Sequence, residues 1–207
     1  MQPFEFATAT RVLFGNGSAR RAVELILEMG RRPLVVTGQT PARAETLVEG
    51  LEQAGADCRL LSFAGEPDVE VVSRSVEYAR TRQFDVVAAI GGGSALDTGK
   101  AIAALVTNPG DALDYLEVVG RGFPVASPPL PFVAIPTTAG TGSEVTRNAV
   151  LAVPDRRVKV SLRSPLMLPR LAIVDPELTW DLPAAVTATT GFDALTQLIE
   201  PFVSPRA

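Results

Sequence analysis

Short apolar runs alternate with helical segments over most of this chain, and no other feature of the sequence limits its fold as strongly. Five runs are apolar nearly throughout, as strands covered on both faces are; they are residues 34–37, 58–63, 84–90, 132–135 and 171–174. Helical periodicity occupies residues 19–29, 41–54, 69–82 and 95–106. This alternation is typical of a parallel sheet with helices on both sides, so we expect an α/β fold with a doubly wound parallel sheet.

The remaining segments predict smaller elements. Residues 4–14 predict a pair of short strands with a turn at residues 7–10, and Ser18 is a candidate N-cap for the first helix. Residues 108–131 contain five prolines and predict a long ordered loop with a short helix around Leu113. Residues 148–162 predict a hairpin with its turn at residues 154–157.

The last part of the chain has a different pattern of apolar residues. Residues 184–190 and 193–203 predict two helices, and no strand follows them. We therefore expect residues 1–182 to form a nucleotide-binding α/β domain, and residues 183–207 to be the first helices of a truncated, all-helical second domain.

Composition excludes several classes of function. A net charge of −4 and a pI near 5.0 argue against nucleic acid or an anionic membrane as a partner. No apolar run approaches the roughly 18 residues of a membrane helix, and no signal-peptide pattern is present, so we expect a cytoplasmic protein. The single cysteine, Cys58, forms no internal disulfide, and the absence of histidine removes imidazole as a base or metal ligand within this chain.

The strongest functional signal is the sequence GGGSALDTGK, which begins at Gly91 between an apolar run and a helix. Three glycines let the backbone approach a diphosphate, while the helix N-terminus supplies N–H donors and the positive end of a dipole. The alternative is a tight strand-to-helix turn, which needs only one glycine. The spacing differs from a Walker A loop, because five residues separate Gly93 from Gly99 and Ala101 follows Lys100.

Two further segments carry polar side chains in suggestive places. The sequence PTTAGTGSEVT at residues 136–146 follows a strand at its carboxyl end, where it suits an adenine, a ribose or a phosphate; a threonine-rich turn is the alternative. Asp193 and Gln197 share one helix face and can offer two oxygen ligands to a divalent cation. Alternatively, Asp193 caps a helix after Gly191 and Gln197 faces solvent.

Taken together, the motifs GGGS-x-x-D-x-x-K, PTT-x-GTGSE and D-A-L-T resemble those of iron-containing (group III) alcohol dehydrogenases. These enzymes are similar in fold to glycerol dehydrogenases and dehydroquinate synthases, and the resemblance covers the whole chain. It implies an NAD(P)-binding α/β domain, an all-helical domain, and a metal (iron or zinc) and substrate between them. It also implies hydride transfer between a small alcohol or aldehyde and NAD(P). We further expect a homo-oligomer.

The resemblance implies roles for particular residues. The implied cofactor-binding residues are Gly38, Asp68, Gly92, Gly93, Ser94, Thr137, Thr138, Thr141, Asn148, Lys159 and Leu178. The implied catalytic residues are Lys159, as a cofactor or proton-relay contact, and Asp97. The implied metal ligands are Asp193 and Gln197.

Three features depart from the family's pattern. Gln197 stands where the second metal ligand is commonly histidine, and an amide oxygen is a poorer ligand for iron or zinc. Two more family histidines belong to the helical domain, of which this chain holds only the start. Gly38 stands where NAD-preferring members have an aspartate that binds the ribose diol, so NADP is allowed beside NAD, with Arg43 as a candidate partner for its 2′-phosphate.

Two alternatives stay open beside a metal-dependent alcohol dehydrogenase. Gln197 favours a metal-independent reductase similar to maleylacetate reductases, whereas the sequence TAGTG at residues 138–142 favours the alcohol dehydrogenases. The missing histidines favour a non-catalytic nucleotide-binding module. Under the leading interpretation, this chain alone binds a nicotinamide nucleotide weakly and does not turn over alcohol.

Overall fold

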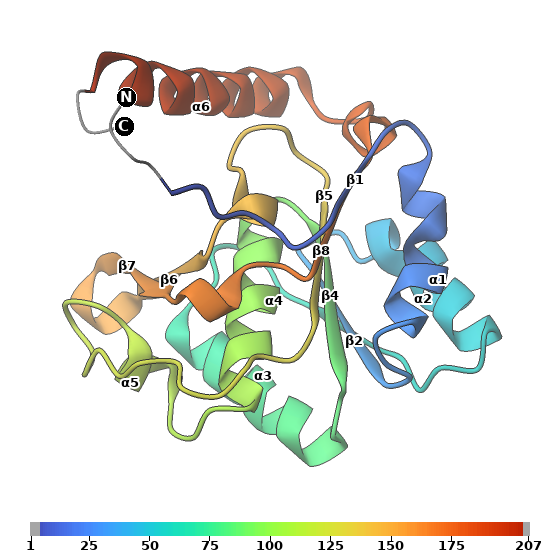
Figure 1. The fold of residues 1–207 in the computed structure, drawn as a ribbon, viewed down its shortest axis with the longest axis horizontal. Coiled ribbons are helices and arrows are strands. Elements are labelled where there is room, and N and C mark those ends of the chain that lie inside the picture. Colours follow the sequence, from blue (N-terminus) through green and yellow to red (C-terminus); the bar gives the residue numbers. More distant parts are fainter. Residues whose placement is uncertain (1–4, 205–207) are drawn as a thin grey trace.

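The computed structural model describes residues 5–204 and contains a six-stranded parallel sheet with helices on both faces (Figure 1). The sheet has the order β1-β8-β5-β4-β2-β3, with β1 (Val12–Phe14), β2 (Pro33–Thr37), β3 (Arg59–Ser62), β4 (Val86–Gly91), β5 (Phe132–Pro136) and β8 (Leu171–Val174). A separate antiparallel hairpin consists of β6 (Asn148–Val153) and β7 (Val158–Arg163). The α-helices are α1 (Ala22–Leu27), α2 (Ala42–Gln53), α3 (Val69–Arg82), α4 (Gly93–Val106), α5 (Ala112–Tyr115) and α6 (Ala184–Val203). The doubly wound parallel sheet is confirmed.

Alternate strand residues face two separate cores. In β2, Val35 packs with residues of α1 and α2, whereas Leu34 and Val36 pack with residues of α3 and α4. Every residue of β2, β4 and β5 is buried. Apart from Thr37 at the end of β2, these central strands carry no polar side chain, as expected of strands that helices cover on both faces.

The chain reverses its direction across the sheet between β2 and β4. It moves outward from β2 to β3, then crosses to the other side of β2 to form β4, β5 and β8 in turn. The helices that follow these two strands, α2 and α4, belong to different cores and so cover opposite faces. A crevice therefore opens at the carboxyl ends of β2 and β4, where open α/β sheets bind ligands.

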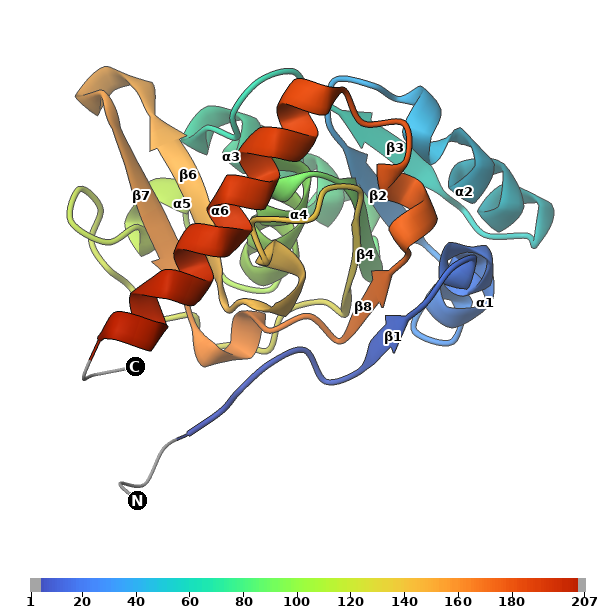
Figure 2. The same cartoon turned by 90° about the horizontal axis from the view of Figure 1, so that it is seen from above.

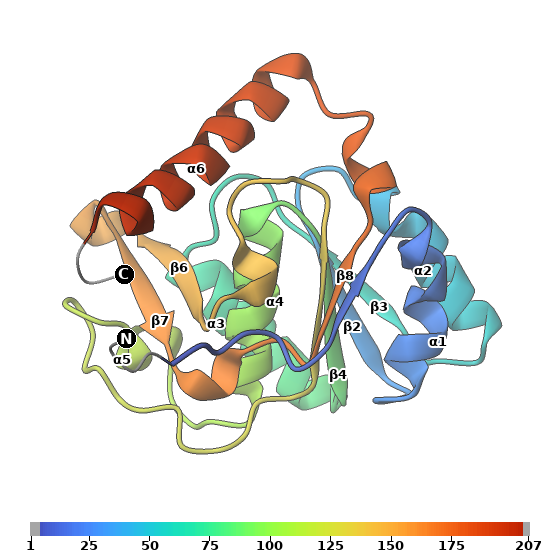
Figure 3. The ribbon, with the colours of Figure 1, turned by 45° about the horizontal axis from the view of Figure 1, so that its top comes forward.

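The C-terminal helix α6 lies over α4 and the β6–β7 hairpin, beside the parallel sheet (Figures 2 and 3). A Cβ at Gly140 would lie only 2.5 Å from the carbonyl oxygen of Thr190, so the loop after β5 closely contacts α6. No residue of α6 is buried. Its exposed large apolar side chains are Phe192, Leu195, Leu198, Ile199, Phe202 and Val203. Between residues 5 and 204, no helix meets the length and hydrophobicity needed to cross a membrane.

The predicted strands, the hairpin and the short helix around Leu113 are confirmed, although β3 lies at the edge of the sheet and is largely exposed, not covered on both faces. The predicted strand pair in residues 4–14 is wrong. Residues 5–11 form no strand, and Phe4 lies outside the described residues. The single strand β1 instead pairs in parallel with β8. Its partner is distant in sequence, and local alternation cannot distinguish this arrangement from a hairpin.

Two predicted helix ends are also wrong. Ser18 is not the N-cap of the first helical turn; the carboxylate of Asp175 accepts hydrogen bonds from the N–H groups of Gly17 (3.0 Å) and Ala19 (2.9 Å) instead. Residues 184–203 form one continuous helix, so Asp193 lies inside it and does not cap it. Gly191 lowers helix propensity without ending the helix.

Candidate functional site

Three successive glycines leave the N-terminus of α4 open after β4. Gly91 has a φ of +155°, and a Cβ there would lie 2.7 Å from the Cβ of Ala95. A Cβ at Gly93 would lie 3.0 Å from Cγ2 of Thr141. The first N–H groups of a helix have no acceptor within it and carry the positive end of its dipole. This end of α4 is therefore suited to bind an anionic group such as a diphosphate.

A cavity of about 330 Å³, which we call the β2 cavity, extends from these glycines over the end of β2. Gly38, Thr137 and Thr138 line it, and none of its described lining residues carries a carboxylate. Arg43, at the start of α2, donates a hydrogen bond of 3.1 Å from Nη1 to Oγ1 of Thr137. An apolar cavity of about 280 Å³ adjoins the β2 cavity through Arg43 and includes Leu178. The two cavities offer a polar rim beside an apolar slot.

A third cavity of about 330 Å³, which we call the α6 cleft, also reaches the α4 N-terminus. Side chains of helix α4, of the loop that follows β5, of strand β6 and of helix α6 line it. Its predicted site residues are Gly93, Ser94, Asp97, Thr141, Asn148, Asp193 and Gln197. Because Gly93 and Ser94 also line the β2 cavity, the two spaces meet around the end of α4.

Asp97 carries an unused acceptor in this cleft. Its Oδ2 accepts a hydrogen bond of 2.9 Å from the Val150 N–H, whereas its buried Oδ1 has no partner among the described residues. Burial raises the pKa of the Asp97 carboxyl above its usual value, although the Val150 hydrogen bond, the charge of Lys100 and the nearby Ser143 hydroxyl act in the opposite direction. A buried acceptor without a partner costs stability and is satisfied when a ligand donates to it.

Lys100 is a buried residue for which sequence reasoning predicted no role. Only 1% of the residue is exposed, and its Nζ donates to the Ser143 carbonyl oxygen (2.7 Å), Thr146 Oγ1 (3.1 Å) and the Asn148 carbonyl oxygen (2.9 Å). Burial lowers its pKa to about 8, against the raising effect of the charges of Asp97 and Glu144. The GGGS-x-x-D-x-x-K motif includes Lys100. Its acceptors could not be predicted from the sequence, because they are two backbone carbonyls and one hydroxyl in a distant segment.

Two predicted residues lie outside these cavities. Lys159 is exposed on β7, where its Nζ lies 3.1 Å from Oε2 of Glu66; Glu66 in turn lines the α6 cleft. Asp68 is the N-cap of α3 and accepts a hydrogen bond of 2.7 Å from the Val71 N–H. Lys159 is therefore one ion pair away from the cleft, and the carboxylate of Asp68 is engaged in capping a helix.

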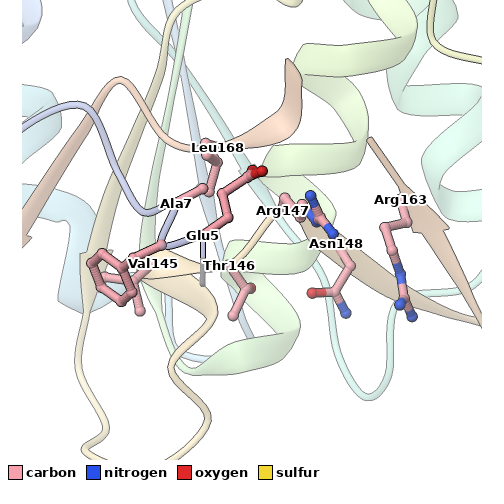
Figure 4. A pocket seen from close by; sticks show the side chains of 9 residues that line it. Glu5, Ala7, Val145, Thr146, Arg147, Asn148, Arg163 and Leu168 are labelled. Atoms are coloured by element: carbon pink, nitrogen blue, oxygen red, sulfur yellow. The ribbon is translucent and has the colours of Figure 1, made fainter. Parts of the chain in front are cut away.

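A larger cavity of about 660 Å³ adjoins the α6 cleft and shares Thr146 and Asn148 with it (Figure 4). The N-terminal segment of residues 5–7 forms one wall, and Arg147 and Arg163 lie beside Asn148 on the other. Arg163 is paired with Glu117 at 3.5 Å. This space was not foreseen from the sequence, because the N-terminal segment and the hairpin are far apart in the chain.

Comparison with known proteins identifies the family of this chain. The family described as "Iron-containing alcohol dehydrogenase" matches residues 9–176. The chain belongs to this family. Among its curated relatives are the 4-hydroxybutyrate dehydrogenase of Cupriavidus necator, 38% identical over 84% of this chain, and the choline dehydrogenase of Bacillus subtilis, 36% identical over 97% of it. These matches cover 46% and 51% of the relatives, so the chain spans about half their length.

Solved structures agree with this iron-containing alcohol dehydrogenase fold. The sulfoacetaldehyde reductase of Bifidobacterium kashiwanohense, solved in complex with NAD⁺, matches 99% of this chain with a TM-score of 0.89 and 33% identity. The match covers 54% of that reductase. The parallel-sheet domain described above is thus a fold shared with an NAD⁺-binding relative.

The family's name implies a metal, which the described residues do not hold by themselves. Asp193 and Gln197 both face the α6 cleft, where Gln197 Nε2 donates a hydrogen bond of 3.3 Å to Asp193 Oδ1. Within residues 5–204 no group of three or more histidine, cysteine, aspartate or glutamate side chains could bind a metal ion. Iron and zinc need at least four ligands, so two oxygens from one helix do not make a complete site.

Proposed function

We propose that this chain is the NAD(P)-binding portion of an alcohol dehydrogenase that transfers a hydride between an alcohol and a nicotinamide. The observation that carries the proposal is the meeting of the β2 cavity and the α6 cleft at the N-terminus of α4. One extended molecule with an anionic centre fits such a path. A dinucleotide has that shape, since its diphosphate lies between two nucleosides.

The lining residues suggest which part of a dinucleotide each would contact. Gly92, Gly93 and Ser94 would hold the diphosphate at the end of α4. Gly38, Thr137, Thr138 and Leu178 would contact the adenosine, and Thr141 and Asn148 the nicotinamide riboside. Lys159 and Asp68 would act on the cofactor only from the rim.

Asp97 would help to orient the nicotinamide half in the α6 cleft. Its Oδ1 has no partner among the described residues but is buried, so the cofactor can donate to it only after the side chain rotates towards the cleft. When bound, the nicotinamide supplies the hydride chemistry. The chain's own part is to bind the cofactor and to hold it at a fixed angle in a partly closed space.

Both NAD and NADP are compatible with the β2 cavity. Because Gly38 brings no carboxylate to the end of β2, nothing there repels a 2′-phosphate, and Arg43 is near enough to line the same cavity. An arginine at this place in a dinucleotide fold accommodates the 2′-phosphate of NADP.

The substrate would be a small alcohol or aldehyde that approaches from the α6 side. The pair Asp193 and Gln197 would supply two oxygen ligands to a metal completed by other groups. The same pair favours a second candidate, a metal-independent reductase similar to maleylacetate reductases, because no histidine accompanies it. Chelator sensitivity of an active, longer form separates these candidates: activity lost to a chelator supports the first, and unchanged activity supports the second.

Calorimetric titration of the chain with NADH and NADPH, alongside an alcohol oxidation assay, tests the proposed function. We expect saturable binding of at least one nucleotide and no alcohol turnover. Heat from neither nucleotide would contradict the binding function. Robust alcohol oxidation by this chain would show that the chemistry has been assigned to the wrong residues.

A further inference from the structure

Lys100 is a buried cation whose hydrogen bonds all go to one short segment of chain. By residue volume, it ranks first among the fully buried side chains in the described part of the chain. No carboxylate of the described residues lies within 4.0 Å of its Nζ, so neutral oxygens satisfy the ammonium. Burying a charge in this way is expensive unless each N–H finds an acceptor. The three acceptors match the three N–H bonds of an ammonium.

The three acceptors belong to residues that form one wall of the α6 cleft. Ser143, Thr146 and Asn148 all line the cleft, together with Ser94 and Asp97 of α4. Ser143 lies in a short 3-10 helix, and Asn148 begins β6. Residues 146–147, which connect these two elements, have no regular secondary structure. Lys100 therefore joins this wall to α4, whose N-terminus also lines the cleft.

We propose that Lys100 is a positioning residue, which holds the wall of residues 143–148 at a fixed distance from the α4 N-terminus and so sets the width of the nicotinamide side of the cofactor site. The inference rests on the proposed nucleotide-binding function. Lys100 itself reaches neither Gly93 nor a ligand at the helix end, because it lies about two helical turns further along α4. Its effect on binding is exerted through Thr146 and Asn148.

The hydrogen bonds from Lys100 to residues 143–148, which we call the clamp, need the charged form of the lysine. A neutral amine has only two N–H bonds for three acceptors, so deprotonation releases at least one of them. The charged groups that face Lys100 are Asp97 from α4 and Glu144 from the 3-10 helix, and Glu66 acts on Asp97. Since burial lowers the pKa of Lys100 to about 8, we expect the clamp to loosen above that pH.

Hydrogen exchange and NADH titration of Lys100→Met test this role, with the exposed Arg74→Met on α3 as the matched control. In Lys100→Met we expect amides of residues 143–148 to exchange about tenfold faster, while those of β2 keep their protection. NADH binding should weaken about tenfold in Lys100→Met and less than about twofold in Arg74→Met. Wild-type affinity should fall above pH 8, and the affinity of Lys100→Met should not change there.

Two results would overturn the proposal: unchanged exchange of residues 143–148 in Lys100→Met, or NADH affinity and pH dependence equal to those of the wild type. If Lys100→Met does not fold, Thr146→Val removes a single acceptor and leaves the lysine in place. We expect this variant to exchange faster only in residues 143–148, and unchanged exchange would again overturn the clamp. If wild-type protein binds no NADH, the proposed function fails, while the exchange measurement still decides the role of Lys100.

Discussion

Gly93 and Gly99 both lie on α4, yet each lacks a side chain for a different reason. A Cβ at Gly93 would approach Thr141 across the cofactor path, whereas a Cβ at Gly99 would lie 2.8 Å from both Ala89 Cβ and Phe132 Cε2 in the sheet. Gly93 therefore lets the helix N-terminus lie close to the loop after β5, and Gly99 lets the helix pack closely on β4 and β5.

Substitution by valine at these two glycines should affect two different properties, NADH affinity at Gly93 and stability at Gly99. Gly93→Val is expected to weaken NADH binding by more than about tenfold, because its side chain would fill the proposed diphosphate site beside Thr141. Gly99→Val should lower the free energy of unfolding by about 1–3 kcal/mol through overpacking. Calorimetry and urea unfolding measure the two effects. Equal NADH affinity of Gly93→Val and wild type would contradict the placement of the diphosphate.

Cofactor preference should depend on Gly38 and Arg43. Arg43→Ala is expected to weaken NADPH binding by about tenfold or more and to change NADH binding less, because only NADPH carries the phosphate. Gly38→Asp should shift preference towards NADH; a Cβ at Gly38 meets no atom within 4 Å, so the carboxylate fits. Paired titrations with the two nucleotides measure the ratio. If Arg43→Ala weakens both equally, Arg43 has no part in recognising the phosphate.

At the scale of elements, Asp175 connects the end of β8 to the start of the first helical segment. Its Oδ1 accepts from the N–H groups of Gly17 and Glu177, both at 3.0 Å, and its Oδ2 accepts from that of Ala19 at 2.9 Å. The side chain is buried, so its loss leaves several N–H groups without acceptors. Hydrogen bonds to a charged group contribute more to stability than neutral ones.

Asp175→Ala should therefore destabilise the fold, and Asp155→Ala on the exposed 3-10 turn after β6 should not. We expect the free energy of unfolding to fall by about 2–4 kcal/mol in Asp175→Ala and by less than about 0.5 kcal/mol in Asp155→Ala. Urea denaturation followed by circular dichroism measures both. Equal stability of the two variants would show that β1, β8 and the first helix are held together by other contacts.

The sheet could be predicted from the sequence because its central strands are buried on both faces and read as continuous apolar runs. The GGGS loop could be predicted because a close backbone approach requires glycine. The cap supplied by Asp175 and the clamp formed by Lys100 could not, since each joins segments far apart in sequence and uses backbone groups that have no residue signature. The same reason explains the failure at residues 4–14, where β1 finds its partner in β8.

At the scale of the whole molecule, α6 presents an apolar surface to solvent. Phe192, Leu198 and Phe202 are 69%, 70% and 90% exposed. An exposed apolar patch of this kind marks a contact surface or promotes association. Helix α6 begins directly after residue 183, the predicted boundary of a second domain, and it offers a surface for the predicted homo-oligomer. Both stay predictions.

Sedimentation velocity tests whether the α6 surface drives association. We expect the chain to form oligomers or aggregates with rising concentration, and the double substitution Leu198→Glu with Phe202→Glu to return it to a monomer, because charge on this surface opposes its burial. Arg74→Glu at an exposed position of α3 serves as a control for added negative charge. A wild-type chain that stays monomeric at every concentration would contradict this expectation.

The central claim is that one dinucleotide lies along the path formed by the β2 cavity and the α6 cleft, across the N-terminus of α4. Amide chemical shifts recorded while NADH is added to the ¹⁵N-labelled chain test it most directly. We predict that the perturbed amides cluster at Gly38, Gly91–Ser94, residues 137–142 and Asn148, with α5 and the region of Cys58 unchanged. Perturbations confined to other surfaces, or none at saturating NADH, would contradict it.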